Sequence, residues 1–110
     1  MRALRRDIFQ GIADPTRRDI LSLIKNGPMN LNSIADKFEM SRPAISQHIK
    51  ILTECGLVLI RQQGRERYCE PHFERLNEVA DWIAPFTKMW EARFNDLDNL
   101  LDELNTKPKE

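Results

Sequence analysis

Residues 41–52 read Ser-Arg-Pro-Ala-Ile-Ser-Gln-His-Ile-Lys-Ile-Leu, and this stretch decides the fold. Ser41 is a residue type that caps helix N-termini, because its hydroxyl accepts a hydrogen bond from a free backbone amide. Gly56 stands directly after Cys55, and glycine often follows the last helical residue because it adopts a left-handed conformation at low cost. The sequence therefore predicts a helix that begins after Ser41 and ends at about Cys55.

This helix has two different faces. Ile45, Ile49 and Leu52 recur every three or four residues, so they share one side and are expected to be buried. The other side chains are turned outward or sideways, and they are Arg42, Pro43, Ser46, Gln47 and Lys50.

A shorter helix is predicted just upstream, from about Leu31 to Phe38, with Asn30 as its N-cap. Only Glu39-Met40 separates it from the capping serine of the next helix. Two helices joined by a turn of about three residues form a helix-turn-helix unit. We place this unit at residues 31–55.

A β-hairpin is predicted directly after this unit. Residues 57–62 are rich in Leu, Val and Ile, Gln63-Gly64 is typical of a turn, and residues 65–70 continue as a second extended segment. A hairpin in this place is a wing, so residues 57–70 complete a winged helix-turn-helix. The wing carries three arginines around Tyr68, and they are Arg61, Arg65 and Arg67.

Two more helices are expected before the helix-turn-helix. Apolar residues at helical spacing predict a first short helix between Arg2 and Ala13. Asp14-Pro15 then combines an N-cap with a proline at the first helical position, and the helix that begins there ends at Asn26-Gly27-Pro28. The predicted fold class is therefore mostly α with a β-hairpin wing.

The C-terminal part, residues 74–104, is predicted to form dimerisation helices. Pro85 interrupts the apolar pattern, so a kink or a break is expected there. An apolar stripe of this length cannot be buried on so small a body, which favours a partner chain as its cover. Packing on its own domain is the alternative. The stripe consists of Ile83, Phe86, Trp90, Phe94, Leu97, Leu101 and Leu104.

Length and composition fit one globular domain, residues 1–110, with 41% hydrophobic and 31% charged residues. The N-terminal residues lack the apolar stretch of a signal peptide, and no run of about eighteen apolar residues could span a membrane. Two cysteines are too few for a disulfide framework. We therefore expect a cytoplasmic protein, and we expect no cofactor.

The charges are distributed unevenly along the chain. Residues 1–69 carry 12 Lys and Arg against 7 Asp and Glu, whereas residues 70–110 carry 5 against 10. This asymmetry favours a polyanionic partner for the first part, although a chance distribution of solvated charge is the alternative.

The helix after Ser41 suits the major groove of double-stranded DNA. An arginine such as Arg42 can donate two hydrogen bonds to guanine, Gln47 can pair with adenine, and Lys50 suits a phosphate. His48 is as well suited to a hydrogen bond within the protein as to a contact with DNA. The expected DNA contacts are Ser41, Arg42, Pro43, Ser46, Gln47, His48 and Lys50 from this helix and Arg61, Arg65 and Arg67 from the wing.

Several segments together resemble the ArsR-like family of small winged-helix repressors. They are Asp14-Pro15-Thr16-Arg17-Arg18, Ser41-x-Pro-x-Ile-Ser-Gln-His-Ile-Lys-x-Leu, Gly56-Leu57-Val58 and Gly64-Arg65-x-x-Tyr68, within a likeness over roughly residues 5–104. The resemblance implies a homodimeric, sequence-specific DNA-binding repressor whose dimer is formed by the first and last helices. A symmetric dimer should prefer a palindromic operator. The first helix would contribute Leu4 and Ile8 to this interface, and the last helix would contribute the apolar stripe.

The resemblance also bears on the signal. The stretch Asp81–Phe86 leading to Trp90-Glu91-x-Arg93 is similar to the branch of self-regulating repressors without obvious metal ligands. The cysteine pair of metal-sensing members falls on Asn30 and Asn32, which are poor ligands for a metal that prefers thiolate or imidazole. We therefore expect no metal site. The inducer, whether a regulatory protein or a small molecule, is left open.

Two further interpretations stay open beside the repressor. One is a winged-helix protein-interaction module that has lost DNA binding. The other is a thiol-responsive repressor that uses Cys55 and Cys69, although no cationic pair or resolving spacing in the sequence marks either thiol as reactive. An enzyme is not expected, because the sequence contains neither a Ser-His-Asp arrangement nor a Gly-rich phosphate loop.

Overall fold

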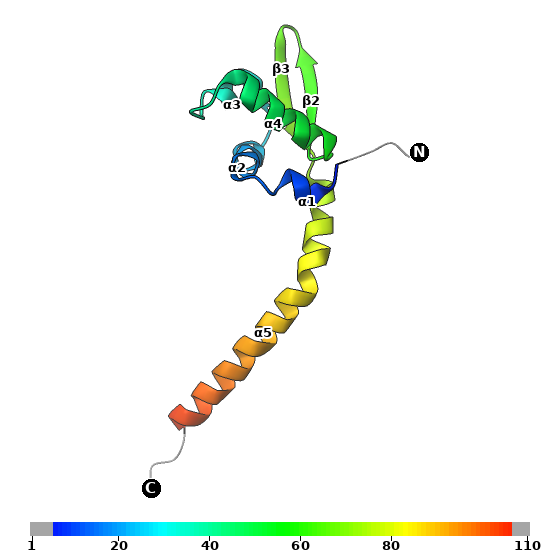
Figure 1. Ribbon diagram of the computed structural model, residues 1–110. Helices are drawn as coiled ribbons and strands as arrows, with labels where there is room; N and C mark the ends of the chain where they lie inside the picture. Colours follow the sequence, from blue (N-terminus) through cyan, green and yellow to red (C-terminus); the bar gives the residue numbers. More distant parts are fainter. Residues whose placement is uncertain (1–5, 107–110) are drawn as a thin grey trace, which may run out of the picture. The chain divides into compact units, whose positions relative to one another are not determined.

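The computed structural model describes residues 6–106, and Figure 1 shows the elements in order. The helices are α1 (Ile8–Gly11), α2 (Pro15–Ile24), α3 (Leu31–Ala35), α4 (Arg42–Glu54) and α5 (Leu76–Thr106). The strands are β1 (Met29–Asn30), β2 (Val58–Gln63) and β3 (Glu66–Pro71), and a 3-10 turn at Phe73–Arg75 precedes α5. The prediction of a mostly helical winged helix-turn-helix is confirmed.

The chain divides into two compact units. One unit ends at Val79 and contains α1 to α4 and the sheet, and the other begins at Ala80 and contains the remainder of α5. The range 1–110, predicted as a single domain, thus comprises a unit with its own core and a helical unit.

The longer helices of the first unit begin and end where the sequence predicts. Asp14 caps α2 by accepting hydrogen bonds from two backbone amides of the first turn at 2.8 and 3.2 Å. The Ser41 hydroxyl caps α4 by accepting from the backbone amide of Ala44 at 3.2 Å. Gly56 follows α4 with a φ of 79°, which is the left-handed conformation expected after a helix. Each N-cap of this kind stabilises its helix by about 1 kcal/mol.

Apolar residues from all four helices of this unit and from the sheet form one core. Ile45, Ile49 and Leu52, the predicted buried face of α4, are all within it. Burying one such side chain stabilises the fold by roughly 1.5–3 kcal/mol. The buried residues are Ile8, Ile20, Leu21, Ile24, Ile34, Ala35, Ile45, Ile49, Leu52, Cys55, Leu57, Val58 and Cys69.

The wing is part of a three-stranded antiparallel sheet with the strand order β1-β3-β2. Met29 pairs with Cys69 on one side of β3, and Ile60 pairs with Cys69 on the other. The two-residue strand β1 was not predicted. The hairpin turn lies at residues 64–65, one residue later than predicted, because Gly64 adopts the positive φ of 64° that the turn requires.

Two predicted helices are shorter than expected. α3 ends at Ala35 rather than at Phe38, and α1 is confined to Ile8–Gly11. Leu4, predicted to contact a partner chain, lies outside the described residues. The same prediction for Ile8 is corrected, since this side chain is completely buried in the core of its own subunit.

α5 runs without a break through Pro85, so of the two alternatives predicted there, a kink or a break, the break is wrong. Proline removes one backbone N–H, which leaves the carbonyl four residues earlier without its helical partner. Pro85 and its neighbours are exposed, so water can hydrate that carbonyl and the helix can continue. Within the described residues, no helix combines the length and hydropathy that a membrane span needs.

Candidate nucleic-acid interface

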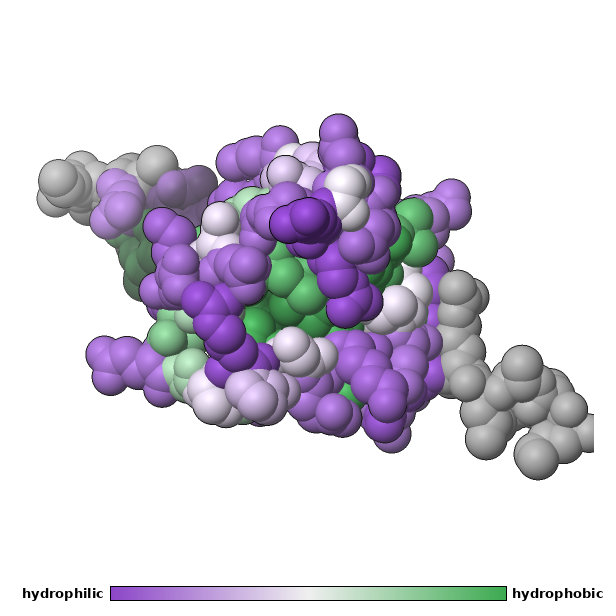
Figure 2. Space-filling model, turned by 90° about the horizontal axis from the view of Figure 1, so that it is seen from above, coloured by the Kyte–Doolittle hydropathy of each residue, from purple (hydrophilic) through white to green (hydrophobic). Residues whose placement is uncertain are grey.

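The predicted contact residues of α4 lie on its solvent-facing side, and we call α4 the recognition helix. The helix turns Ile45, Ile49 and Leu52 into the core. Its exposed residues are Ser41, Arg42, Pro43, Ser46, Gln47 and Lys50. Figure 2, which views the molecule from above relative to Figure 1, shows mostly hydrophilic residues around a smaller apolar area. Such a surface suits polar contacts rather than a hydrophobic docking partner.

Arg42 at the start of the recognition helix is oriented by α3. Its guanidinium donates to the side-chain oxygen of Asn32 and forms an ion pair with Asp36 at 3.2 Å. The Arg42 side chain is nevertheless 59% exposed. α3 therefore presents this arginine at the helix N-terminus without enclosing it.

The three wing arginines differ in their surroundings. Arg61 forms an ion pair with Glu70, donates to Gln63 at 2.7 Å, and lies 5.4 Å above the ring of Tyr68. Arg65 in the turn and Arg67 on β3 are exposed. Arg61 is thus largely engaged within the wing, whereas the other two present their charge to solvent.

Between the recognition helix and the wing lies a groove that joins both predicted contact surfaces. Ile49 and Ile60 contribute apolar surface to it, and Ser46, Lys50 and Arg67 line it with polar groups. The sequence assigned these three polar residues to DNA contacts separately, and the structure brings them together in one place.

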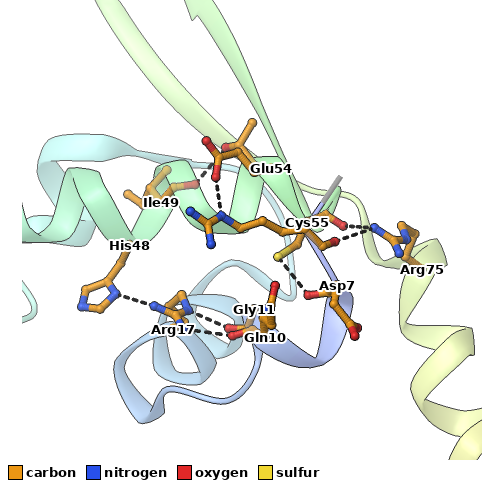
Figure 3. Close-up of polar contacts among 11 residues, drawn as sticks. Asp7, Gln10, Gly11, Arg17, His48, Ile49, Glu54, Cys55 and Arg75 are labelled. Carbon is orange, nitrogen blue, oxygen red and sulfur yellow. Dashed lines mark hydrogen bonds and ion pairs between the residues drawn. The ribbon is translucent and has the colours of Figure 1, made fainter. Parts of the chain in front are cut away.

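His48 is the exception among the predicted contacts, because it is half-buried. Its Nδ1 atom lies 3.2 Å from Nη1 of Arg17 and 4.0 Å from Oδ2 of Asp14, as Figure 3 shows for the arginine. A hydrogen bond within the protein was one of the two roles expected for His48, and this bond exists, to the side chain of Arg17 in α2. The backbone amides of Arg17 and Thr16 hold the pKa of Asp14 below its ordinary value, against the opposing effect of partial burial.

Sequence analysis missed the structural roles of three arginines. Arg17 also donates to the backbone carbonyls of Gly11 and Gln10, and Arg18 donates to that of Ile12 at 2.7 Å. Arg75 donates to the carbonyl of Cys55 at 2.6 Å and so stabilises the end of the recognition helix. These bonds depend on tertiary packing, and the only signal in the sequence was the position of Arg17 in the first turn of α2.

Both cysteines are free and buried. Desolvation by burial raises the pKa of the Cys55 thiol, and it raises the pKa of the Cys69 thiol to about 11. A thiol with a raised pKa forms little reactive thiolate near neutral pH. These surroundings speak against the thiol-responsive alternative.

The two asparagines at the metal-sensing positions have structural roles. Asn30 caps α3 through the backbone amide of Asn32 at 2.7 Å and also bonds to Glu66. The side chain of Asn32 accepts from Arg42. Among residues 6–106, no group of three or more His, Cys, Asp or Glu side chains is arranged to hold a metal ion.

Comparison with known proteins gives consistent matches. A family model described as bacterial regulatory protein, arsR family, matches residues 14–59. Over 80 residues the chain is 35% identical to the transcriptional repressor SdpR of Bacillus subtilis (strain 168), a match that covers 73% of this chain and 89% of that protein.

Solved structures give the same result. The chain is similar to the crystal structure of a possible transcriptional regulator for arsenical resistance, with a TM-score of 0.62, 35% identity, and coverage of 96% of this chain and 99% of that chain. It shares its fold with the homodimeric winged helix-turn-helix DNA-binding domain Mb0332 from Mycobacterium bovis, with a TM-score of 0.60, 22% identity, and coverage of 74% and 75%.

Proposed function

Because the chain belongs to the ArsR family and is a DNA-binding transcriptional repressor, we propose that it binds a palindromic operator as a homodimer. The observation that carries this proposal is the apolar face of α5. Ten of the twelve large hydrophobic residues that are exposed in the described part of the chain lie on this one helix. A face of this kind on a single subunit marks a surface that another chain covers.

The spacing on α5 supports a helix as the partner. Trp90, Phe94, Leu97, Leu101 and Leu104 alternate between steps of four and three residues, which is the heptad pattern of packed helices. We therefore propose that α5 pairs with α5 of a second copy. The proposed interface residues are Ile83, Phe86, Trp90, Phe94, Leu97, Leu101 and Leu104.

The apolar face is wider than one helix pair needs. Trp82, Met89 and Leu100 are also exposed, and they lie about 100–120° around the helix from Ile83 at 3.6 residues per turn. A seam between two helices covers a narrower stripe. Leu4, which was predicted to belong to the same interface, lies outside the described residues, whereas Ile8 belongs to the subunit core.

The recognition helix of each subunit is proposed to enter one major groove. Arg42 and Gln47 read base edges near the helix N-terminus, and Lys50 with Arg67 contacts a phosphate at the groove between the helix and the wing. Arg65 contacts the backbone from the wing turn. Arg61 contributes less, because Glu70 already neutralises it. A two-fold dimer places its half-sites about one turn of DNA, or about 34 Å, apart.

Titration of the purified chain against DNA from its own upstream region tests this function. We expect a sequence-selective complex whose affinity falls at least about a hundredfold between 50 and 200 mM salt, since several phosphates are neutralised per dimer. A complex whose affinity depends neither on the DNA sequence nor on the salt concentration contradicts the proposal.

Two variants with a matched control separate the proposed roles. Gln47→Ala is expected to reduce the preference for the operator over unrelated DNA, by about 1–3 kcal/mol for each base pair that it reads. Arg65→Ala is expected to weaken binding to all DNA sequences alike and to lower the salt dependence of the affinity. Lys88→Ala, which removes a charge from α5, serves as the control and should leave both quantities unchanged. Equal loss of discrimination in the first two variants contradicts these assignments.

A further inference from the structure

The contact between α2 and the recognition helix fixes the chemical form of His48. Nη1 of Arg17 lies 3.2 Å from Nδ1 of His48, as Figure 3 shows. A guanidinium has only N–H donors and keeps its charge, so Nδ1 has to accept this hydrogen bond. A neutral imidazole that accepts at Nδ1 carries its proton on Nε2. In this arrangement, His48 is therefore the Nε2–H tautomer.

Arg17 is itself held firmly from the opposite side. Its Nε and Nη2 atoms donate to the carbonyls of Gly11 and Gln10, at the end of α1, at 2.8 and 2.9 Å. Its backbone amide donates to Asp14 at 3.2 Å, and Oδ2 of the same aspartate lies 4.0 Å from Nδ1 of His48. A planar guanidinium fixed through several of its donors has little freedom. The imidazole ring that it contacts is oriented as a result.

The second ring nitrogen of His48 is accessible from outside. In Figure 3 the ring turns one nitrogen toward Arg17 and the other nitrogen away from it. Within the described part of the chain, Nε2 has no hydrogen-bond partner. Every buried side-chain nitrogen or oxygen in that part does have a partner, so Nε2 is not buried and reaches solvent. The His48 side chain as a whole is only 18% exposed. It thus offers one N–H donor at the edge of an otherwise enclosed ring.

We propose that Arg17 is a positioning residue that makes His48 an Nε2–H donor to one phosphate of the DNA backbone. This inference rests on the proposed function, because it requires the recognition helix to lie in the major groove. A ring that reaches solvent only at its edge cannot extend to the base pairs, whereas phosphates line both rims of the groove and accept hydrogen bonds. The contact fixes the register of the helix and carries no sequence information.

Two substitutions of His48 separate its two ring positions. His48→Asn keeps an oxygen near the place of Nδ1, where it still accepts from Arg17, but it has no donor at the distance of Nε2. His48→Gln extends an amide to that distance. We expect His48→Asn to weaken binding about tenfold on operator and unrelated DNA alike, as the loss of one hydrogen bond to a charged group predicts. His48→Gln should weaken DNA binding by less than about threefold.

Operator duplexes with single neutral methylphosphonates identify the phosphate itself. At one position, the methylphosphonate should weaken binding of the wild-type chain but cause no further loss with His48→Asn, because both changes remove the same contact. Equal losses for the two His48 variants, or additive losses at every phosphate, overturn the proposal.

The role of Arg17 is tested by a spectroscopic measurement that a purely structural role would not change. Long-range 1H–15N spectra of the folded protein at about pH 8, where histidine is mostly neutral, distinguish the two tautomers. We expect His48 of the wild-type chain to be the Nε2–H form and Arg17→Met to give a mixture. Arg18→Met is the matched control, since Arg18 also donates to a backbone carbonyl but, within the described residues, forms no hydrogen bond with His48. Retention of the Nε2–H form in Arg17→Met, with unchanged DNA affinity, overturns the positioning role.

The outcomes also distinguish a failure of this inference from a failure of the proposed DNA-binding function. A wild-type chain that binds no DNA overturns the proposed function and the phosphate contact together. A wild-type chain that binds its operator, with His48→Asn unchanged in affinity, overturns only the contact.

Discussion

The two units of this chain differ in how their apolar residues are covered. In the unit that ends at Val79, thirteen residues from the helices and the sheet form one buried core. In the unit that begins at Ala80, every side chain from Ala80 to Asn105 is exposed in the single subunit. Both regions show equally clear helical periodicity, so periodicity alone does not reveal whether the partner of an apolar face lies in the same chain. The difference predicts that the first unit depends on intramolecular packing and the second on association.

The largest expected effect comes from placing charge on the apolar face of α5. The double substitution Leu97→Glu with Leu101→Glu is expected to convert the dimer to a monomer, because two carboxylates cannot be desolvated in an apolar seam. Operator affinity should fall at least about a hundredfold, since the two half-sites no longer bind as one unit.

Sedimentation equilibrium and operator titration measure these two quantities. The control is Asn95→Glu with Asn99→Glu, which adds the same charge to the polar side of the helix. A dimer that survives the first pair of substitutions, or that is lost equally with the second pair, contradicts the proposed interface.

The next effect concerns the core of the first unit. Leu52→Ala removes a side chain with no exposed surface from the recognition helix and is expected to lower the free energy of unfolding by about 2–5 kcal/mol. The loss should not depend on protein concentration, unlike losses caused by substitutions on α5. Leu59→Ala on β2, where the leucine is 48% exposed, is the control and should cost much less. Urea unfolding at several concentrations of each variant measures the difference.

Most of the first unit could be predicted because its signals are local. Ser41 and Asp14 cap helices through neighbouring amides, and Gly56 ends one through its own backbone conformation. The alternation of buried and exposed positions on the recognition helix follows from spacing alone. For this reason, the helix-turn-helix and the exposure of most predicted contact residues were accessible from the sequence.

The features that were missed depend on residues far apart in the chain. Strand β1 consists of Met29 and Asn30 only, and it exists because it pairs with β3 about forty residues later. The contact between Arg17 and His48 likewise joins two helices across 31 residues. A break does not occur at Pro85 for the opposite, local reason, since an exposed helix can hydrate the carbonyl that proline leaves unpaired.

The burial of Cys69 gives a smaller effect that depends on pH. Its pKa is raised to about 11 from an ordinary value of 9.0, so the folded state favours the neutral thiol. The resulting stability is complete below the unfolded pKa and is lost as the pH rises through the range between these values. We expect this group to cost about 2 kcal/mol of stability near pH 10.5, a loss that Cys69→Ala should not show. Urea unfolding near pH 7.5 and near pH 10.5 measures it.

Thiol reactivity checks the same burial near neutral pH. Both cysteines should react slowly with a disulfide reagent in the folded protein and rapidly in denaturant. Fast labelling of folded protein would revive the thiol-responsive alternative and contradict a closed core in the first unit.

The smallest expected effect lies on the surface of that unit, where Nε of Arg6 donates to a carboxylate oxygen of Glu54 at 2.5 Å. The hydrogen bond from Arg6 holds the pKa of Glu54 below its ordinary value of 4.5, so the stabilisation is present above that pH and is lost as the pH falls below it. Both side chains are substantially exposed, at 46% and 38%, and solvent screens such a pair.

Glu54→Gln should therefore shift the unfolding midpoint by no more than about 1 °C at pH 7, and by less at high salt or below pH 4. Glu39→Gln, which removes an equal charge from a residue without an ion pair in residues 6–106, is the control. A larger shift for Glu54→Gln that persists in high salt would mean that this contact, and not the apolar core alone, makes the first unit independent of a partner.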